Sequence, residues 1–326
     1  MSFIEVKQIS KTFKVAKKKS GLKEAFKSFF NREYVNVSAV QDISFSIEKG
    51  EIVGYIGPNG AGKSTTIKIL SGILTPDSGE CIVDGKIPWK DRVQYVKNIG
   101  VVFGQRSQLW WDIPAEDTFE LLKDIYDIPQ DEYLKSREEL IQKLNLEDII
   151  NIPVRQLSLG QRMRCEIAAS LLHNPEILFL DEPTIGLDAI SKQLVRDFIR
   201  NLNKEKKTTI ILTSHDMSDI TTLAKRIILI GKGQVLYDGG LKKLLHQYGT
   251  IKTIQVKTND SFQLRKKGIL SKSKINGGYE LTIDTNQIGI SELLNSISKK
   301  VVIQDIDIQD QSVDSMIVQL YEDYKI

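Results

Sequence analysis

The sequence contains no long hydrophobic run. No uninterrupted apolar stretch approaches the roughly 20 residues that a membrane-spanning helix needs. The first residues, MSFIEVKQIS, place acidic and polar side chains where a signal peptide would carry its apolar core. These two absences predict a cytosolic chain that does not itself cross a membrane, so any transport function would require a separate membrane partner.

Cysteine is also scarce, and neither sign of charge dominates. Cys81 and Cys165 cannot build a disulfide framework or a zinc site, which fits a reducing compartment and predicts two buried or incidental thiols. With 45 basic and 42 acidic residues the formal net charge is only +3, so we expect no nucleic-acid partner. An apolar fraction of 41% over 326 residues is ample for packed cores, and this length predicts two domains.

The first 240 residues have the pattern of an α/β domain. Residues 3–9 and 43–56 are predicted strands, and the second leads through a glycine-rich loop into a helix at Ser64–Leu70. Apolar residues at helical spacing over residues 115–172 predict a helical subdomain inserted in this domain. Two further apolar strands are expected beyond it, at Ile177–Leu180 and Thr209–Thr213.

The composition changes after turns rich in Gly and Lys near residues 231–240. Residues 241–326 are predicted to form a small α+β accessory domain with strands and helices at 253–257, 278–284, 291–298, 301–308 and 312–324. The last helix carries an apolar stripe on one face, which predicts that it docks on a sheet. The stripe consists of Val313, Met316, Ile317, Leu320, Tyr321 and Tyr324.

A G-x-x-x-x-G-K-S pattern follows the predicted strand directly. Glycines let backbone N–H groups curl around phosphates, and the helix N-terminus adds partial positive charge. Lys63 would reach the phosphates, and Ser64 would ligate Mg²⁺. The loop alone does not distinguish a kinase, a GTPase or an ATPase. Its predicted nucleotide-binding residues are Gly57, Pro58, Asn59, Gly60, Ala61, Gly62, Lys63, Ser64 and Thr65.

Two acids end the apolar strand at 177–180, in a pattern that resembles a Walker B strand. Such a strand would deliver Asp181 and Glu182 to the carboxyl edge of the sheet, beside the phosphate loop. Asp181 would hold Mg²⁺ through water, and Glu182 would orient or deprotonate the attacking water. The alternative is a strand that ends in two solvated acids before Pro183.

The run Leu157-Ser158-Leu159-Gly160-Gln161 resembles the LSGGQ signature of the ABC (ATP-binding cassette) family. Leu159 replaces the first glycine, while Ser158, Gly160 and Gln161 match. A helix is expected to begin here, so Ser158 would lie at an N-terminus suited to a γ-phosphate. In isolation, the pentapeptide could equally be a helix cap.

Other family positions follow in order along the chain. Gln105, in VVFGQ, matches the Q-loop glutamine, and the resemblance implies roles in nucleotide sensing, catalysis and Mg²⁺ binding. Gly186-Leu187-Asp188 matches the D-loop, which implies that Asp188 approaches nucleotide at a dimer interface. His215 matches the switch histidine, which contacts the γ-phosphate and, with Glu182 and Lys63, completes the implied catalytic group.

The resemblance covers residues 3–240 and implies a P-loop NTPase fold that binds ATP and Mg²⁺. In such families two cassettes enclose two ATP molecules, so one chain holds half of each site. The implied partners are a second cassette, identical or paralogous, and a transmembrane permease at the cytoplasmic face of a bacterial membrane. For the aromatic residue that stacks on adenine, Phe13 is favoured and Tyr34 is the competitor.

An insertion at residues 17–34 separates Phe13 from the next strand. Leu22, Ala25, Phe26, Phe29 and Phe30 follow helical spacing, with lysines on either side, which predicts a basic amphipathic helix at a membrane surface or permease. The alternative is a helix packed back on its own domain.

The stretches VVFGQRSQLWWD and LSLGQRMR are similar to ATP-binding subunits of ABC-2 type exporters, including viologen and drug exporters. We therefore expect an exporter subunit with an ABC-2 type permease. An importer subunit would share the same cassette chemistry. A soluble ABC ATPase of ribosomes or DNA usually carries two cassettes or long coiled coils, and neither appears here. The pair of Glu182 and His215 argues against a pure binding module.

Overall fold

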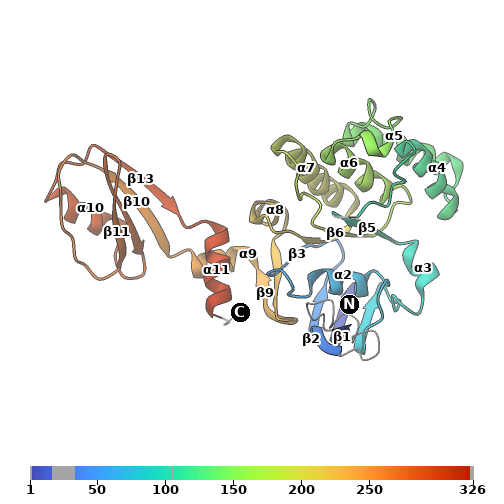
Figure 1. Cartoon of the computed structure of the whole chain (residues 1–326), viewed down its shortest axis with the longest axis horizontal. Coiled ribbons are helices and arrows are strands. Elements are labelled where there is room, and N and C mark those ends of the chain that lie inside the picture. The colour runs from blue at the N-terminus through green and yellow to red at the C-terminus, as the bar shows by residue number, and fades with distance from the viewer. Residues whose placement is uncertain (1, 17–33, 105, 324–326) are drawn as a thin grey trace, which may run out of the picture. The chain divides into compact units, whose positions relative to one another are not determined.

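The computed structural model describes residues 2–16, 34–104 and 106–323. The chain divides into two compact units, Met1–Gly239 and Gly240–Ile326 (Figure 1). The predicted amphipathic insertion at residues 17–33 and the predicted Q-loop residue Gln105 lie outside the described residues.

A six-stranded sheet forms the centre of the first unit, in the order β5-β6-β7-β3-β8-β9. Neighbouring strands from β5 to β8 run parallel, and β9 must reverse direction because only two residues join it to β8. β6 and β7 are buried throughout, as expected where both faces of a parallel sheet are covered. The strands are β3 (Ile52–Ile56), β5 (Ile99–Phe103), β6 (Ile177–Asp181), β7 (Thr209–Thr213), β8 (Arg226–Gly231) and β9 (Gln234–Gly240).

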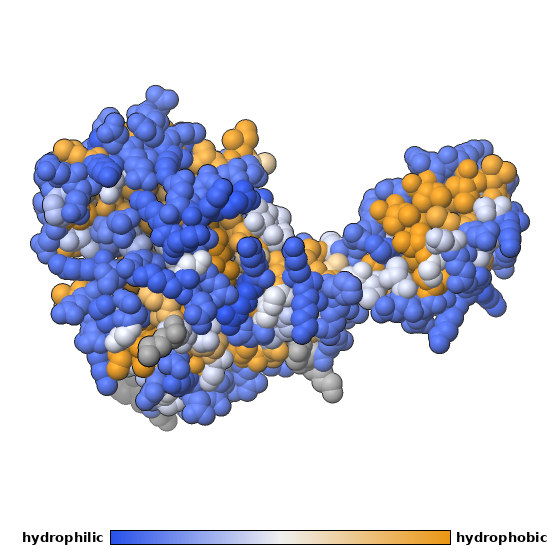
Figure 2. All heavy atoms as spheres, turned by 180° about the vertical axis from the view of Figure 1, so that it is seen from behind, coloured by the Kyte–Doolittle hydropathy of each residue, from blue (hydrophilic) through white to orange (hydrophobic). Residues whose placement is uncertain are grey.

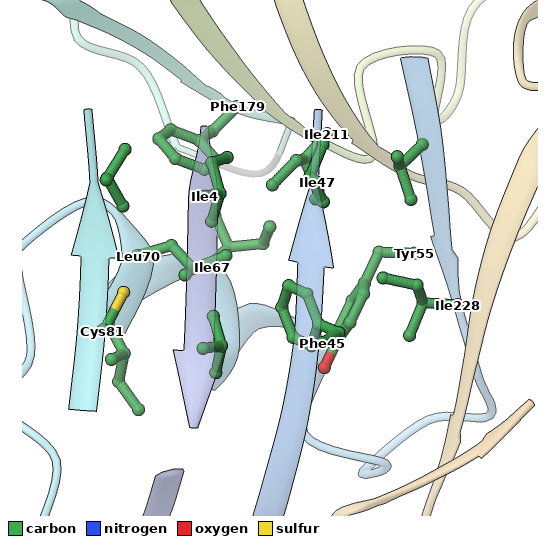
Figure 3. Close-up of a cluster of buried hydrophobic side chains, with 14 of the residues drawn as sticks. Ile4, Phe45, Ile47, Tyr55, Ile67, Leu70, Cys81, Phe179, Ile211 and Ile228 are labelled. Carbon is green, nitrogen blue, oxygen red and sulfur yellow. The ribbon is translucent and has the colours of Figure 1, made fainter. Parts of the chain in front are cut away.

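A second, antiparallel sheet packs against this one through a shared core. Its strands are β1 (Ile4–Ala16), β2 (Tyr34–Ile47) and β4 (Ser78–Val83), with β1 in the middle. The core contains side chains from both sheets and from helix α2 (Lys63–Leu70), among them Ile4, Phe45, Ile67 and Phe179 (Figure 3). The phosphate loop therefore leaves one sheet and enters a helix that is buried between two sheets.

The single strand predicted over residues 43–56 is wrong. It is two strands, β2 and β3, which belong to different sheets. The break falls at Gly50, whose φ of +75° is a left-handed conformation that glycine adopts without strain. The strand predicted at 3–9 also extends further, to Ala16, because it pairs along its length with β2. The turns predicted at 231–240 are instead the β8–β9 hairpin, which turns at Lys232 and Gly233.

Helices cover the central sheet and fill the inserted region. Residues 115–172 contain three α-helices and a short 3-10 turn. Among the described residues of the first unit, the helices besides α2 are α3 (Arg92–Val96), α4 (Ala115–Ile125), α5 (Gln130–Leu144), α6 (Leu159–Ala169), α7 (Ala189–Lys206) and α8 (Met217–Leu223), and the 3-10 turn is Val154–Gln156.

Both cysteines of the chain are buried free thiols, as predicted. Burial raises the pKa of the Cys81 and Cys165 thiols to about 12, so neither forms a reactive thiolate at neutral pH. Within residues 2–16, 34–104 and 106–323, no helix is long and apolar enough to span a membrane.

The C-terminal unit is a four-stranded antiparallel sheet in the order β11-β12-β10-β13. Helix α10 (Ile290–Ser298) covers one face, where Ile254, Leu281 and Leu293 are fully buried. The opposite face is polar, with Gln255 bonded to Glu280 across the strands. The strands are β10 (Ile251–Lys257), β11 (Ile269–Ile275), β12 (Gly278–Asp284) and β13 (Asp305–Asp310).

The structure of this unit differs from the predictions in four places. Helix α9 (Leu241–Tyr248) and strand β11 were not predicted, since β11 carries mostly Ser and Lys and shows little apolar alternation. The strand expected at 301–308 begins only at Asp305. Helix α11 (Val313–Asp323) buries Met316, Ile317 and Leu320, but its main partner is α9, because α10 already covers the sheet.

Apolar residues also gather on the surface of the C-terminal unit (Figure 2). Its most exposed large apolar side chains are Leu270, Val302, Ile308 and Val318.

We expect the variant Ile254→Ala to destabilise the C-terminal unit by about 2–5 kcal/mol, because it opens a cavity in the centre of the core. Hydrogen exchange of the β10 and β12 backbone amides should accelerate accordingly. The control Leu270→Ala removes a side chain that is 54% exposed and should leave exchange nearly unchanged. Equal effects of the two substitutions would contradict the assigned core.

Candidate nucleotide site

The phosphate loop occupies the connection between β3 and α2, and its glycines are sterically required. Gly60 and Gly62 have φ angles of +79° and +105°. A Cβ atom at Gly57 would lie 2.4 Å from the Ile230 carbonyl oxygen, and one at Gly62 would lie 2.3 Å from that of Ala39. The loop can therefore curl tightly enough for its backbone N–H groups to gather at the N-terminus of α2, a geometry that suits a phosphate group.

Lys63 is buried within the curl of this loop. Its Nζ atom donates to the carbonyl oxygens of Gly57 at 2.7 Å and Pro58 at 3.2 Å. Burial lowers the pKa of the ammonium group, and the nearby carboxylates of Glu182 and Asp181 oppose this shift. The cation is thus held between the loop carbonyls and the two acids.

The two predicted acids lie at the carboxyl end of β6. Thr213, opposite Asp181 on β7, donates its hydroxyl proton to Asp181 Oδ1 at 2.6 Å. The Glu182 backbone N–H donates to the Thr213 carbonyl at 3.1 Å, and Glu182 has a φ of +58°. A non-glycine residue in this region is strained, and such strain is common at functional sites. β6 and β7 together therefore fix the backbone of both acids.

A cavity of about 270 Å³ connects the acids with the phosphate loop. Ser64, Asp181 and Glu182 all line it, together with Lys68, Ile73, Phe103, Gly104 and Arg106. Hydroxyl and carboxylate oxygens are the donors that Mg²⁺ prefers, so this set could hold the ion with help from water and phosphate. In the described part of the chain, no group of three or more His, Cys, Asp or Glu residues could hold a metal by itself.

His215 contacts Glu182 directly. Their Nε2 and Oε1 atoms are 2.6 Å apart, and the side chains are 42% and 13% exposed. A second cavity, of about 230 Å³, lies on this side of Glu182. Its lining residues are Glu182, Thr184, Ile185, Gly186, Lys192, Ser214, His215 and Asp216. Glu182 therefore faces two cavities, one towards the phosphate loop and one towards the histidine.

The signature residues form the N-terminus of α6. Ser158 and Gln161 make a capping box, in which Ser158 Oγ accepts from the Gln161 N–H at 3.2 Å and Gln161 Oε1 accepts from the Ser158 N–H at 2.8 Å. Both side chains remain accessible. No signature residue lines either of the two cavities at Glu182.

The glycine of the signature serves helix packing. A Cβ atom at Gly160 would lie 2.4 Å from Ser191 Oγ on α7. Leu159, which replaces the usual glycine, packs beside Gly186 of the predicted D-loop, where a Cβ would lie 2.8 Å from the leucine side chain. The signature and the D-loop segment are thus neighbours within one chain.

Asp188 is the N-cap of α7. Its carboxylate accepts from the Ser191 N–H at 2.9 Å and the Ser191 hydroxyl at 2.7 Å, and these bonds hold the pKa of Asp188 below its ordinary value. The structure therefore gives Asp188 a capping role inside its own subunit.

The two candidate adenine-stacking residues lie on the paired strands β1 and β2, at different distances from the phosphate loop. Phe13 pairs with Val37, which is two residues from Ala39, the residue whose carbonyl touches Gly62. Tyr34 is five residues from Ala39, which along a strand is about 16 Å. Phe13 is half-buried, while Tyr34 is 58% exposed.

Sequence reasoning missed Glu166, a buried carboxylate on α6. It accepts hydrogen bonds from Ser107 Oγ and from the Gln108 N–H at 3.1 Å, and burial raises its pKa. Arg162 of the same helix lies over the Trp111 ring, 5.9 Å from its centroid. The Arg162–Trp111 contact joins the stretch 101–112 to the stretch 157–164, and Glu166 lies two residues beyond the second stretch. The sequence signal that could have revealed Glu166 is an acidic residue among the apolar residues of a predicted helix.

Comparisons with known proteins identify the family. The model of the ABC transporter family matches residues 40–185. The ATP-binding protein NatA of Bacillus subtilis is 37% identical over 64% of this chain and 84% of that protein. The linearmycin resistance ATP-binding protein LnrL of B. subtilis is 31% identical over 82% of this chain and 86% of that protein.

Other relatives are named for a different role or are solved structures. The methionine import ATP-binding protein MetN 2 of Enterococcus faecalis is 33% identical over 65% of this chain and 63% of that protein. A dimeric ATP-binding cassette in a post-hydrolysis state, bound to ADP and phosphate, is 28% identical with a TM-score of 0.61, over 73% of this chain and 98% of that one. The fold, the motif order and these relatives agree: the chain belongs to the ABC transporter family, as an ATP-binding subunit with the family's ATPase cassette.

Proposed function

We propose that this subunit hydrolyses ATP in a site completed by a second cassette, and that hydrolysis drives a separate membrane permease. The observation that carries the proposal is the contact of Glu182 with His215 beside the phosphate loop, in a chain whose signature residues line neither cavity there. Half of the site lies at the carboxyl edge of the sheet, and the complementary half is at the N-terminus of α6.

Nucleotide binding rests on the loop from Gly57 to Thr65. Its backbone N–H groups enclose the phosphates, and Lys63 turns its ammonium group from the loop carbonyls towards them. Ser64 and Asp181, with Gln105, are the proposed holders of Mg²⁺. When bound, the ion neutralises charge on the phosphate oxygens.

Glu182 is the proposed general base. Its side chain is only 13% exposed and lines the cavity that also contains Ser64, so it is placed to accept a proton from the attacking water. His215 holds the Glu182 carboxylate through Nε2 and supplies a polar group on the γ-phosphate side. The strained backbone of Glu182 fixes this orientation before nucleotide arrives.

The second cassette would supply Ser158, Gly160 and Gln161. The hydroxyl of Ser158 accepts one hydrogen bond within α6, so its own proton remains available for a phosphate oxygen of the partner site. The helix N-terminus adds a favourable partial charge. Asp188 caps α7 next to this surface and would lie at the dimer interface.

We propose Phe13 as the residue that stacks on adenine. Its pairing with Val37 places it near Ala39 and hence near Gly62, whereas Tyr34 lies further along the strand. A half-buried aromatic face can stack on a purine with little loss of conformational entropy.

The proposed partner is an ABC-2 type permease that exports its substrate. This rests on the similarity of residues 101–112 and 157–164 to exporter subunits, two stretches that the Arg162–Trp111 contact brings together. Among relatives, LnrL is named for linearmycin resistance. Import is the competing function, because MetN 2 is named as an importer. Transport assays of the chain with its permease in sealed vesicles would separate the two directions.

The variant Glu182→Gln should lower kcat for ATP hydrolysis by about 10²–10⁴-fold, because the amide cannot accept the proton of water. ATP affinity should be retained, and the ATP-bound dimer should accumulate on size-exclusion chromatography. Asp305→Asn, which removes an exposed carboxylate of the C-terminal unit that pairs with Lys257, is the control. Near-normal turnover by Glu182→Gln would exclude Glu182 as the base.

The variant Phe13→Ala should weaken ATP binding by about 2- to 10-fold through loss of stacking. Tyr34→Ala should have little effect. Isothermal titration of the two variants with ATP decides between them, and the reverse order of effects would assign stacking to Tyr34.

Replacing Phe26, Phe29 and Phe30 with serine should weaken association with permease-containing membranes by about tenfold or more, because three apolar side chains are lost. Nucleotide binding should remain. The matched control replaces the exposed Leu270, Val302 and Val318 with serine, and flotation assays measure both triple variants. Unchanged flotation of the first variant would favour a helix packed on its own domain.

A further inference from the structure

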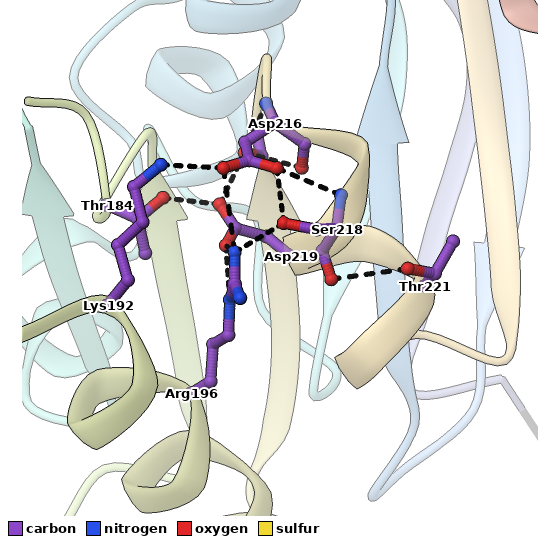
Figure 4. A network of polar contacts seen from close by, with 8 residues as sticks. Thr184, Lys192, Arg196, Asp216, Ser218, Asp219 and Thr221 are labelled. Atoms are coloured by element: carbon purple, nitrogen blue, oxygen red, sulfur yellow. Dashed lines mark hydrogen bonds and ion pairs between the residues drawn. The ribbon is translucent and has the colours of Figure 1, made fainter. Parts of the chain in front are cut away.

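A network of charged and hydroxyl groups surrounds the loop that carries His215 (Figure 4). At its centre is Asp219 on α8, whose side chain is fully buried. Arg196 of α7 donates from Nε to Asp219 Oδ1 at 2.6 Å. The second carboxylate oxygen accepts hydrogen bonds from Thr184 and, at 2.7 Å, from Ser214. A buried carboxylate in this setting is saturated with donors from three separate segments.

These three segments bear directly on hydrolysis. Thr184 follows Glu182 by two residues and is only 3% exposed. Ser214 immediately precedes His215. Arg196 lies on α7, the helix that Asp188 caps. One carboxylate therefore fixes Thr184, two residues after the proposed base, and Ser214, the residue before the histidine, to the same helix.

The other neighbour of His215 is tied to the same helix. Asp216 accepts from Lys192 Nζ at 2.6 Å and lies 3.5 Å from Arg196 Nη2. Burial would raise the pKa of Asp216, but hydrogen bonds from Lys192 and Ser218 outweigh it and lower the pKa to about 2. The carboxylate is therefore ionised throughout the neutral range. Both flanks of His215 are anchored to α7, one by each acid.

We propose that Arg196 and Asp219, with Thr184, are positioning residues for hydrolysis: they hold the His215 loop and the segment after Glu182 in one unit with α7. The contact between His215 and Glu182 needs both loops in register, and misplacement of catalytic groups by about 1 Å can cost about 10²-fold in rate. The inference rests on the proposed roles of Glu182 and His215.

The position of α7 also links Arg196 and Asp219 to the signature residues. Ser191, on the first turn of the helix, packs on Gly160 of the signature, and Leu159 packs beside Gly186. One end of α7 thus contacts the signature surface that is proposed to bind the partner's ATP. One to two turns later, the same helix anchors the loop that carries His215. A displacement of α7 at the signature would be transmitted to His215 through the Arg196–Asp219 pair.

The test uses the full-length chain and variants that spare the fold. Arg196→Gln alone leaves a buried unpaired carboxylate, which destabilises proteins strongly, so the double variant Arg196→Gln with Asp219→Asn removes both charges together. Thr184→Val removes one hydroxyl, keeps the branched shape and leaves the ion pair intact. The control is Arg200→Gln with Asp197→Asn, an exposed ion pair on the same helix.

We expect Thr184→Val and the Arg196/Asp219 double variant to lower kcat by about 10- to 100-fold, with KM for ATP and the melting temperature of Thr184→Val nearly unchanged. The Arg200/Asp197 control should hydrolyse ATP at the normal rate. In a His215→Ala background, Thr184→Val should cause a smaller loss than it causes alone, because one of the two groups that it positions is gone.

Full kcat in folded Thr184→Val, or a loss that adds fully to that of His215→Ala, would overturn the inference. If Glu182→Gln and His215→Ala themselves hydrolyse ATP normally, the proposed function fails instead. The two failures are therefore distinguishable in one set of assays.

Discussion

The parallel register between β6 and β7 is the constraint on which the site depends. Asp181 lies opposite Thr213, so the residues that follow, Glu182 and the His215 loop, leave the sheet side by side. On the other side of β6, Phe103 pairs with Asp181, so Gly104 passes the Glu182 carbonyl where a Cβ would approach within 2.2 Å. β3 pairs with β7 and brings the phosphate loop to the same edge. A register shift of one residue would turn each of these side chains to the opposite face.

Much of this arrangement could be predicted because its functional residues occur in short contiguous motifs. Gly57–Ser64 signals a loop and a helix start, and apolar residues 177–180 signal a buried strand that ends in acids. The carboxyl ends of parallel strands meet at one edge, so the motifs were expected to converge, and the structure does bring Lys63, Glu182 and His215 together there. For the signature, the prediction of a helix N-terminus is confirmed by the capping box of Ser158 and Gln161.

The features that could not be predicted depend on contacts between residues distant in sequence. The bonds of Glu166 to Ser107 and of Arg196 to Asp219 join separate elements, and no local pattern reveals either partner. Residues 43–56 alternate well enough for one strand, and only the assembly of two sheets shows the break at Gly50. Likewise, the apolar stripe of α11 specifies burial but not the partner, which is α9.

The same reasoning explains why the two half-sites that one chain contributes, one to each proposed ATP site, would not act independently. Gly160 is small because Ser191 occupies the space of a side chain, so the signature helix α6 cannot shift without pressing on α7. α7 in turn is bonded to both flanks of His215 through Asp216 and Asp219. A partner that engages the signature therefore acts on the histidine of the adjoining site through packed atoms and paired charges. Because Arg196 is only 13% exposed and Asp219 is fully buried, salt should screen this pair only weakly.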